Sequence, residues 1–169
     1  MPDQGIDIRD GLTMRPARAS DGTFLASLYR DSRQDLLLGL DGEPDFIETV
    51  IELQQRCQTT GYGNDFPNAM YFVVERLGDP IGRVAVDFRQ AEVRVLDIAL
   101  IAAARGQGYG TAVLRALQAA AAKAMAPLSL SVMQHNLGAR RLYATLGFRV
   151  AESRPPVDLM VWTPVSLSP

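Results

Sequence analysis

Cysteine, histidine and lysine are almost absent from this 169-residue sequence, which holds one of each: Cys57, His135 and Lys123. A single thiol excludes a disulfide framework and a multi-thiolate metal site, and a single imidazole excludes a histidine-rich metal centre. The length suits one domain that can bury a hydrophobic core without disulfides or metals. We therefore expect no metal cofactor.

Long hydrophobic runs are also missing. The longest uninterrupted apolar run covers residues 98–104, about a third of the length that a membrane span needs. Residues 1–11 are polar and acidic, without the basic and apolar regions of a signal peptide. The sequence therefore predicts a cytoplasmic protein with a polar leader at 1–11, a single domain at 12–165 and no membrane partner.

Neither sign of charge is in large excess, because the sequence has 17 basic and 19 acidic residues. This balance argues against nucleic acid as a partner. The charges are unevenly distributed: residues 31–52 contain seven acids and one base, whereas residues 83–154 contain ten bases and four acids. The later part would suit an anionic ligand and the earlier part a cationic one, although solvated helix faces would give the same pattern.

The apolar periodicities predict a mixed α/β fold, a single sheet with helices packed on it. Neither an internal repeat nor a linker long enough to separate domains is present. We expect strands at 12–15, 70–77, 81–88, 92–101, 128–133, 148–153 and 159–163. We expect helices at 20–30, 44–60, 137–146 and from the end of a glycine-rich loop to about 125.

The strand at 92–101 changes its alternation. Val93 and Val95 place the early apolar positions on odd numbers, whereas the later ones, from Leu96 to Leu100, are even. A strand has period two, so the change predicts one extra residue, a β-bulge, near residues 95–97. The alternative is a strand buried on both of its faces.

A glycine-rich loop, residues 105–110, lies between this strand and the next helix. Gly106, Gly108 and Gly110 permit positive φ and close approach of a ligand to the backbone, and a helix N-terminus attracts phosphate. A P-loop would require a lysine that is absent, and a dinucleotide site would require an acid about 20 residues further on. Since no acid occurs between Asp97 and Glu152, a phosphate-bearing ligand other than a dinucleotide remains.

At three places the sequence resembles the GNAT acetyltransferases. Arg105, Gly108 and Gly110 match the family's Arg/Gln-x-x-Gly-x-Gly/Ala motif, directly after a strand. Residues 136–148 resemble its Asn-x-x-Ala-x-x-Leu-Tyr-x-x-x-Gly-Phe element, and residues 14–21 its first strand and helix cap. The resemblance covers residue 14 to about 163, and it implies a mostly antiparallel central sheet with a β-bulge, flanked by helices.

The resemblance also implies acetyl-CoA as cosubstrate and an amine as acceptor. The backbone of the bulged strand would bind the pantetheine arm, the loop amides the pyrophosphate, and the side chain of Asn136 the CoA arm. The residues implied in CoA binding are Ile98, Ala99, Leu100, Arg105, Gly106, Gln107, Gly108, Tyr109, Gly110, Thr111, Asn136, Ala139 and Tyr143.

In such a reaction the acyl group passes directly from the thioester to an amine, which must first lose a proton because its pKa is roughly 10. The family's usual base is a carboxylate on the bulged strand, acting through water. Glu92, which has the spacing found in some members, is the preferred candidate, and Asp97, which lies nearer the expected thioester, is the second; a water without a dedicated base is the third option. Tyr143 matches the family's general acid, and a core tyrosine is the alternative.

The acceptor is the least determined part. In this fold the first two helices and the following loop usually form the amine pocket, and the aromatic and acidic candidates are Phe24, Tyr29, Asp31, Asp35, Tyr62, Phe66 and Tyr71. We interpret His135 as a structural or surface residue, Cys57 as a packing residue and Trp162 as a core residue. The sequence predicts an N-acetyltransferase, monomeric or homodimeric; an inactive acyl-CoA-binding module and transfer of a longer acyl group are the alternatives.

Overall fold

The computed structural model describes residues 5–37 and 69–167, and within the first helix the side chains up to residue 31. The predicted helix at 44–60 and the predicted loop at 61–68 lie outside the described residues. The strands are β1 (Ile6–Arg9), β2 (Leu12–Pro16), β3 (Ala69–Arg76), β4 (Asp79–Phe88), β5 (Val93–Leu100), β6 (Leu128–Met133), β7 (Arg149–Arg154) and β8 (Val157–Trp162). The helices are α1 (Gly22–Leu37), α3 (Tyr109–Lys123) and α4 (Leu137–Thr145), with short 3-10 helices η1 (Ala19–Asp21), η2 (Ala102–Ala104) and η3 (Val165–Leu167).

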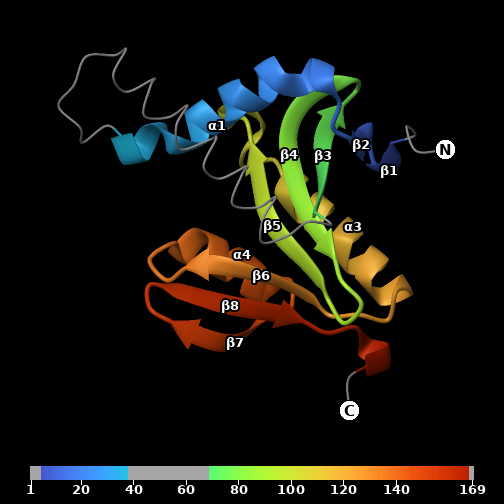
Figure 1. Cartoon of the computed structure of the whole chain (residues 1–169), viewed down its shortest axis with the longest axis vertical. Coiled ribbons are helices and arrows are strands. Elements are labelled where there is room, and N and C mark those ends of the chain that lie inside the picture. The colour runs from blue at the N-terminus through green and yellow to red at the C-terminus, as the bar shows by residue number, and fades with distance from the viewer. Residues whose placement is uncertain (1–4, 38–68, 168–169) are drawn as a thin grey trace.

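Eight strands form one sheet in the order β1-β2-β3-β4-β5-β6-β8-β7 (Figure 1). Only β5 and β6 pair in parallel, and every other pair is antiparallel. This arrangement confirms the predicted mixed α/β fold with a mostly antiparallel central sheet. Among the described residues, no helix is long and apolar enough to cross a membrane.

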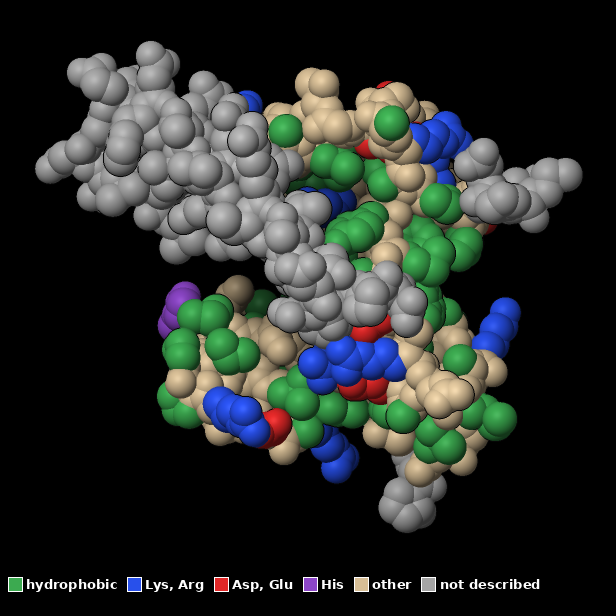
Figure 2. All heavy atoms as spheres, in the orientation of Figure 1, with side chains coloured by type: hydrophobic (Ala, Val, Ile, Leu, Met, Phe, Trp, Pro, Cys, Tyr) green, Lys and Arg blue, Asp and Glu red, His purple; other side chains and the backbone are tan. Residues whose placement is uncertain are grey.

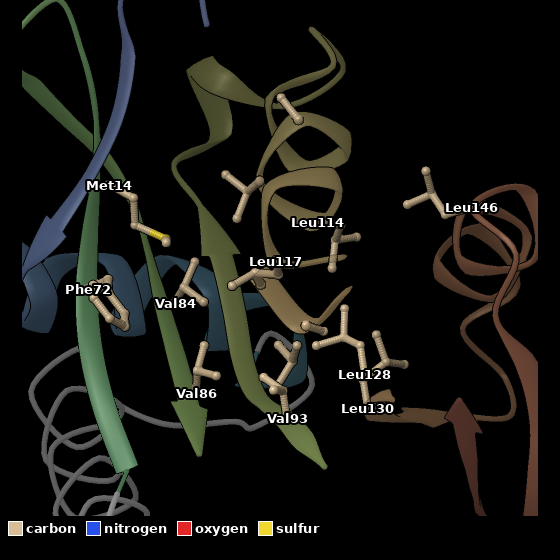
Figure 3. Close-up of a cluster of buried hydrophobic side chains, with 14 of the residues drawn as sticks. Met14, Phe72, Val84, Val86, Val93, Leu114, Leu117, Leu128, Leu130 and Leu146 are labelled. Atoms are coloured by element: carbon tan, nitrogen blue, oxygen red, sulfur yellow. The ribbon is translucent and has the colours of Figure 1, made fainter. Parts of the chain in front are cut away.

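The main core lies between the sheet and α3 (Figure 3). Val84 and Val86 of β4 join Leu114 and Leu117 of α3 in one buried cluster. Because side chains of a strand alternate between faces, Ala85, also buried, belongs to the opposite face of the sheet, which contacts α1. The sheet is therefore covered by α3 on one face and by α1 on the other.

The predicted bulge in β5 is confirmed. Val86 of β4 pairs with Val95, but its neighbour Ala85 pairs with Asp97, so Leu96 is the extra residue. The parallel pairing of β5 with β6 covers only Val93–Val95 and ends at the same point. Beyond it the sheet divides, and Figure 1 shows the half with β1–β5 diverging from the half with β6–β8.

The N-terminal region differs from the expected polar leader. Ile6–Arg9 forms an edge strand paired with β2, and Ile8 packs against the core. The two strands are joined by Asp10 and Gly11, both at positive φ (49° and 78°), as a tight hairpin turn requires. The acidic composition of the segment hides a strand whose apolar side chains, Ile6 and Ile8, follow the period of two.

The first helix extends beyond the predicted end near residue 30, to Leu37. Its entry is held by Asp21, whose carboxylate accepts from the backbone N–H of Arg18 (2.7 Å) and pairs with Arg15 (2.8 Å). Asp21 thus closes the turn before the helix.

Candidate functional site

The glycine-rich loop lies where the sheet divides, between η2 and the N-terminus of α3. Gly106 and Gly108 have φ of 73° and 85°, which confirms the expected left-handed conformation at these two positions. Gly110 lies inside α3 and is not among the glycines at positive φ, so it does not use the conformational freedom that glycine permits. As the second residue of the helix it adopts helical backbone instead.

The first turn of α3 offers free backbone donors. Gly108 precedes the helix without a side-chain cap, and the first amide bonded back to it is that of Ala112. The amides of Tyr109, Gly110 and Thr111 therefore have no acceptor within the helix. Together with the helix dipole, they form an arrangement suited to a phosphate group.

Two polar side chains hold the loop in shape. Arg105 donates from Nε to the carbonyl of Leu100 (3.1 Å), and Gln107 donates from Nε2 to the carbonyl of Ala103 (2.7 Å). Both bonds connect the loop to the end of β5 or to η2. The side chains of Arg105 and Gln107 thus stabilise the loop, which leaves binding to its backbone amides, as the resemblance implied.

The other predicted CoA contact is the outer edge of β5. Ile98, Ala99 and Leu100 pair with β4 on one side, whereas the pairing with β6 has ended at Val95. An unpaired strand edge presents backbone N–H and C=O groups, which can bind an extended molecule as a further strand would. The open edge leads directly toward the glycine-rich loop, so the two predicted binding elements are contiguous.

Helix α4 borders the divided part of the sheet from the other half. Asn136 begins it, and its Oδ1 accepts from the backbone N–H of Ala139 (3.2 Å). The structure therefore gives Asn136 a capping role, and its Nδ2 donates to no described residue. Gly147 closes the helix region at φ of 94°, as predicted.

Tyr143, on α4, has a pKa raised above its ordinary value of 10, first because it is largely buried and second because of the negative charge of Asp97. Its ring packs against Phe148, with the centroids 5.9 Å apart. Its hydroxyl makes no hydrogen bond to a described residue, unlike the hydroxyl of a satisfied core tyrosine. The phenol is thus protonated at neutral pH and available as a donor.

Asp97 is the carboxylate that the bulge brings toward Tyr143. It follows the extra residue Leu96 and pairs across the sheet with Ala85, which places it on the α1 face. Arg83 of β4 donates to its Oδ2 from Nε (2.8 Å) and from Nη2. Oδ1 accepts no hydrogen bond from a described residue, so one oxygen of a half-buried carboxylate stays available.

Glu92 lies at the closed end of the same strand. Its carboxylate accepts from Ser129 Oγ (2.7 Å) and forms ion pairs with Arg89 (3.3 Å) and Arg94 (3.4 Å). It precedes the paired segment Val93–Val95, about 15 Å along the strand from Asp97. The structure thus separates the two candidate bases, and only Asp97 lies beside the open edge.

Figure 2 shows the α1 side of the molecule, where basic and acidic side chains lie next to one another near the centre of the view. Of the candidates for the acceptor pocket, Phe24 and Tyr71 are half-buried and Asp31 is exposed. Tyr29 is only 3% exposed and belongs to the packing of α1. Asp35, Tyr62 and Phe66 lie outside the described side chains.

Arg83 is a site residue that sequence reasoning missed. The sequence signal was a single arginine within the apolar stretch of β4 from Ile81 to Val86. Arg83 lies two positions before Ala85, which pairs with Asp97, so the side chains of Arg83 and Asp97 are on the same face of the sheet.

The interpretation of His135 as a surface residue is confirmed, because it is exposed and appears at the edge of Figure 2. Trp162 packs against the core as expected, and Cys57 lies outside the described residues.

Metal ligands do not gather in the described part of the chain, where no three His, Cys, Asp or Glu side chains form a cluster. The site consists instead of a backbone edge, a helix N-terminus, one carboxylate and one phenol.

Comparison with known proteins gives matches of two kinds. Residues 26–148, more than half of the chain, match the model of the acetyltransferase (GNAT) family. A search of the curated proteins finds no match.

Solved structures share the fold at low sequence identity. The PaiA N-acetyltransferase from Thermoplasma acidophilum, in complex with coenzyme A, superposes with a TM-score of 0.67 at 16% identity, over 90% of this chain and 98% of that one. The ribosomal-protein-S5-alanine acetyltransferase from Vibrio fischeri gives a TM-score of 0.66 at 18% identity, over 99% and 100% of the two chains. FdhC, described as a nucleotide-linked sugar GNAT, gives 0.64 at 13% identity, over 96% and 90%.

Proposed function

The chain belongs to the GNAT acetyltransferase family, and from this premise we propose that it is an acetyl-CoA-dependent N-acetyltransferase that acts on a primary amine of a small molecule or a protein. The observation that carries the proposal is the open edge of β5, which runs into the free amides of α3 and has Asp97 and Tyr143 beside it. Binding groups and acid–base groups thus meet at one division of the sheet.

The cosubstrate would be held mainly by backbone. The edge at Ile98–Leu100 would bond the amide groups of the pantetheine arm, and the amides of residues 109–111 would bind the pyrophosphate. Arg105 and Gln107 would act indirectly, because their side chains bond the loop itself. Asn136 would cap α4 through Oδ1 and offer Nδ2 to the CoA arm.

Acyl transfer at this site needs three proton movements. The protonated amine gives one proton to Asp97, directly or through water, and its nitrogen then attacks the thioester carbon to form a tetrahedral intermediate. When the C–S bond of this intermediate breaks, the sulfur leaves with the bonding electron pair and receives the proton of Tyr143. The nitrogen gives its second proton, through water, to the Tyr143 phenolate, and Asp97 releases its proton to solvent, so the acid and the base are both restored.

Asp97 is the better candidate for the base. Its charge acts on Tyr143 and one of its oxygens has no hydrogen-bond donor among the described residues, whereas Glu92 is occupied by Ser129, Arg89 and Arg94 at the closed end of the strand. Arg83 bonds only Oδ2 of Asp97 and thereby fixes its rotamer, while Oδ1 has no donor among the described residues.

The test is a turnover screen in which acetyl-CoA is combined with polyamines, amino acids, aminoglycosides and peptides with free N-termini, and released thiol is measured. At least one class should give thiol release above the enzyme-free rate, and Tyr143→Phe should abolish most of it. Tight CoA binding in calorimetry without transfer to any acceptor would instead support an inactive acyl-CoA-binding module.

A further inference from the structure

A second carboxylate, outside the proposed chemistry, is buried at the base of α4. Asp158 of β8 is 2% exposed. Its Oδ1 accepts from Gln134 Nε2 (2.8 Å) and from Ser153 Oγ (2.7 Å), and its Oδ2 forms an ion pair with Arg140 Nη2 (3.1 Å). The bonds from Gln134 and Ser153, followed by the charge of Arg140, hold the pKa of Asp158 below its ordinary value. The group is thus a fixed negative charge with partners on both oxygens.

These contacts close a ring between β8 and the start of α4. Gln134 follows β6, and its backbone N–H donates to the carbonyl of Pro156 in the β7–β8 turn (2.8 Å). Arg140, in the first turns of α4, also donates from Nη1 to the carbonyl of Gln134 (3.3 Å). Asp158 therefore connects strand β8 both to Gln134, which precedes α4, and to Arg140, which lies within α4.

Helix α4 is held less firmly by apolar burial than α3 is. It has nine residues, of which Ala139, Leu142 and Tyr143 pack partly buried against the core and none is completely buried, and a helix of this length is marginal without tertiary contacts. Its C-terminal end is attached through Leu146, which is 9% exposed and accepts at its carbonyl from Gln118 of α3 (2.8 Å). The N-terminal end of α4 is attached by the polar ring around Asp158.

The residues of the ring lie close in sequence to two residues of the proposed site, Asn136 and Tyr143. Asn136 lies between Gln134 and Arg140, and Tyr143 lies three residues, or about one turn, beyond Arg140. We infer that Asp158 is a positioning residue of the acyl-CoA site, which acts through Gln134 and Arg140 to set the helix carrying Asn136 and Tyr143 against the open edge of β5. This inference rests on the proposed function for the identity of the ligand.

The test compares the wild type with Asp158→Asn, which keeps the shape and removes the charge. We expect the dissociation constant for CoA in calorimetry, and the KM for acetyl-CoA, to rise about tenfold, since small displacements of positioning groups have effects of this size. A residue that only maintained folding would reduce the active fraction, which lowers the apparent kcat and leaves KM unchanged. An unchanged dissociation constant and KM would overturn the inference.

A paired variant separates positioning from stability. Asp158→Asn with Arg140→Gln removes both charges, so neither is left without its partner and much of the lost thermal stability should return. CoA binding should stay weak, because the connection from β8 to α4 is still broken. If CoA affinity returned together with the melting temperature, the role of Asp158 would be structural only.

Asp87 provides a matched control, because it is also buried (3% exposed) and paired with an arginine, Arg89. Asp87→Asn should lower the melting temperature and leave CoA affinity within twofold of the wild type. If Asp158→Asn does not fold, Gln134→Met breaks the same ring more mildly and should still weaken CoA binding measurably. Absence of CoA binding by the wild type would defeat the proposed function, whereas equal binding by wild type and variants would defeat this inference alone.

Discussion

Helices α3 and α4 border the same division of the sheet but are attached to it by different forces. Five residues of α3 are buried, Ala112, Val113, Leu114, Leu117 and Ala121, whereas α4 contributes only partly buried side chains and is also held by the ring around Asp158. A helix packed by buried apolar side chains cannot shift without losing contacts with the core. A helix held by hydrogen bonds and ion pairs is positioned instead by the preferred distances and angles of those bonds. Helix α3, whose N-terminal amides would bind phosphate, is therefore part of the main core. Helix α4, which carries the proton donor Tyr143, is fixed separately.

The largest effect is expected in α3. Leu117→Ala removes a side chain that is 2% exposed and should lower the free energy of unfolding by about 3 kcal/mol in urea denaturation. Leu142→Ala in α4 removes a half-buried side chain and should cost about 1 kcal/mol. Equal losses of unfolding free energy in the two variants would show that apolar burial holds α3 and α4 equally.

The next effect concerns catalysis from α4. Tyr143→Phe keeps the ring against Phe148 and removes the proton donor, so kcat should fall about a hundredfold. Since the variant leaves α4 in place, and CoA would be held by β5, α3 and Asn136, the dissociation constant for CoA in calorimetry should stay within twofold. A normal kcat would remove Tyr143 from the role of acid, and a large change in CoA affinity would show that the Tyr143 hydroxyl binds the cosubstrate.

A smaller effect should distinguish the two carboxylates of the bulged strand. Asp97→Asn is expected to lower kcat/KM for the acceptor about tenfold, because the carboxylate beside the open edge is lost. Glu92→Gln, at the closed end, should change kcat/KM by less than threefold. The reverse ranking, measured on the same acceptor, would assign the base to Glu92.

The smallest effect concerns acid stability at the entry to α1. The bond from Arg15 lowers the pKa of Asp21 from 3.8 to about 2, so its stabilising contribution is complete above pH 4 and is lost as the pH falls toward 2. Asp21→Asn should therefore be less stable than the wild type by about 1 kcal/mol at pH 7, a value reduced for solvent screening, with the difference shrinking at pH 2 to 3. Glu152→Gln, in the exposed pair with Arg154, should show no such dependence in urea titrations.

Local patterns predicted most of the fold. The change of parity around Val95 located the bulge, because side-chain alternation in a strand is a strict geometric property. The strand Ile6–Arg9 was missed because a short acidic edge strand buries little, and its pairing with β2 depends on a hairpin turn formed by Asp10 and Gly11.

The site was less predictable than the fold. The loop glycines and Tyr143 have local signals, but the ion pairs of Asp97 with Arg83 and of Asp158 with Arg140 join residues 14 and 18 positions apart. Such pairs depend on strand register and on the placement of a helix, which sequence spacing alone does not determine. For the same reason the sequence favoured Glu92 over Asp97 as the base, although Glu92 lies before the paired end of β5 and only Asp97 lies beyond the bulge.

The central claim is that the open edge of β5 and the N-terminus of α3 form one acyl-CoA cradle. Its most direct test is a calorimetric titration of CoA into the wild type and into Gly108→Val, with thermal unfolding to confirm that both are folded. Valine is strained at the φ of 85° found at this position, so the account predicts one CoA per wild-type chain and at least about tenfold weaker binding by the variant. Absence of binding by the folded wild type, or equal affinity of the two proteins, would contradict it.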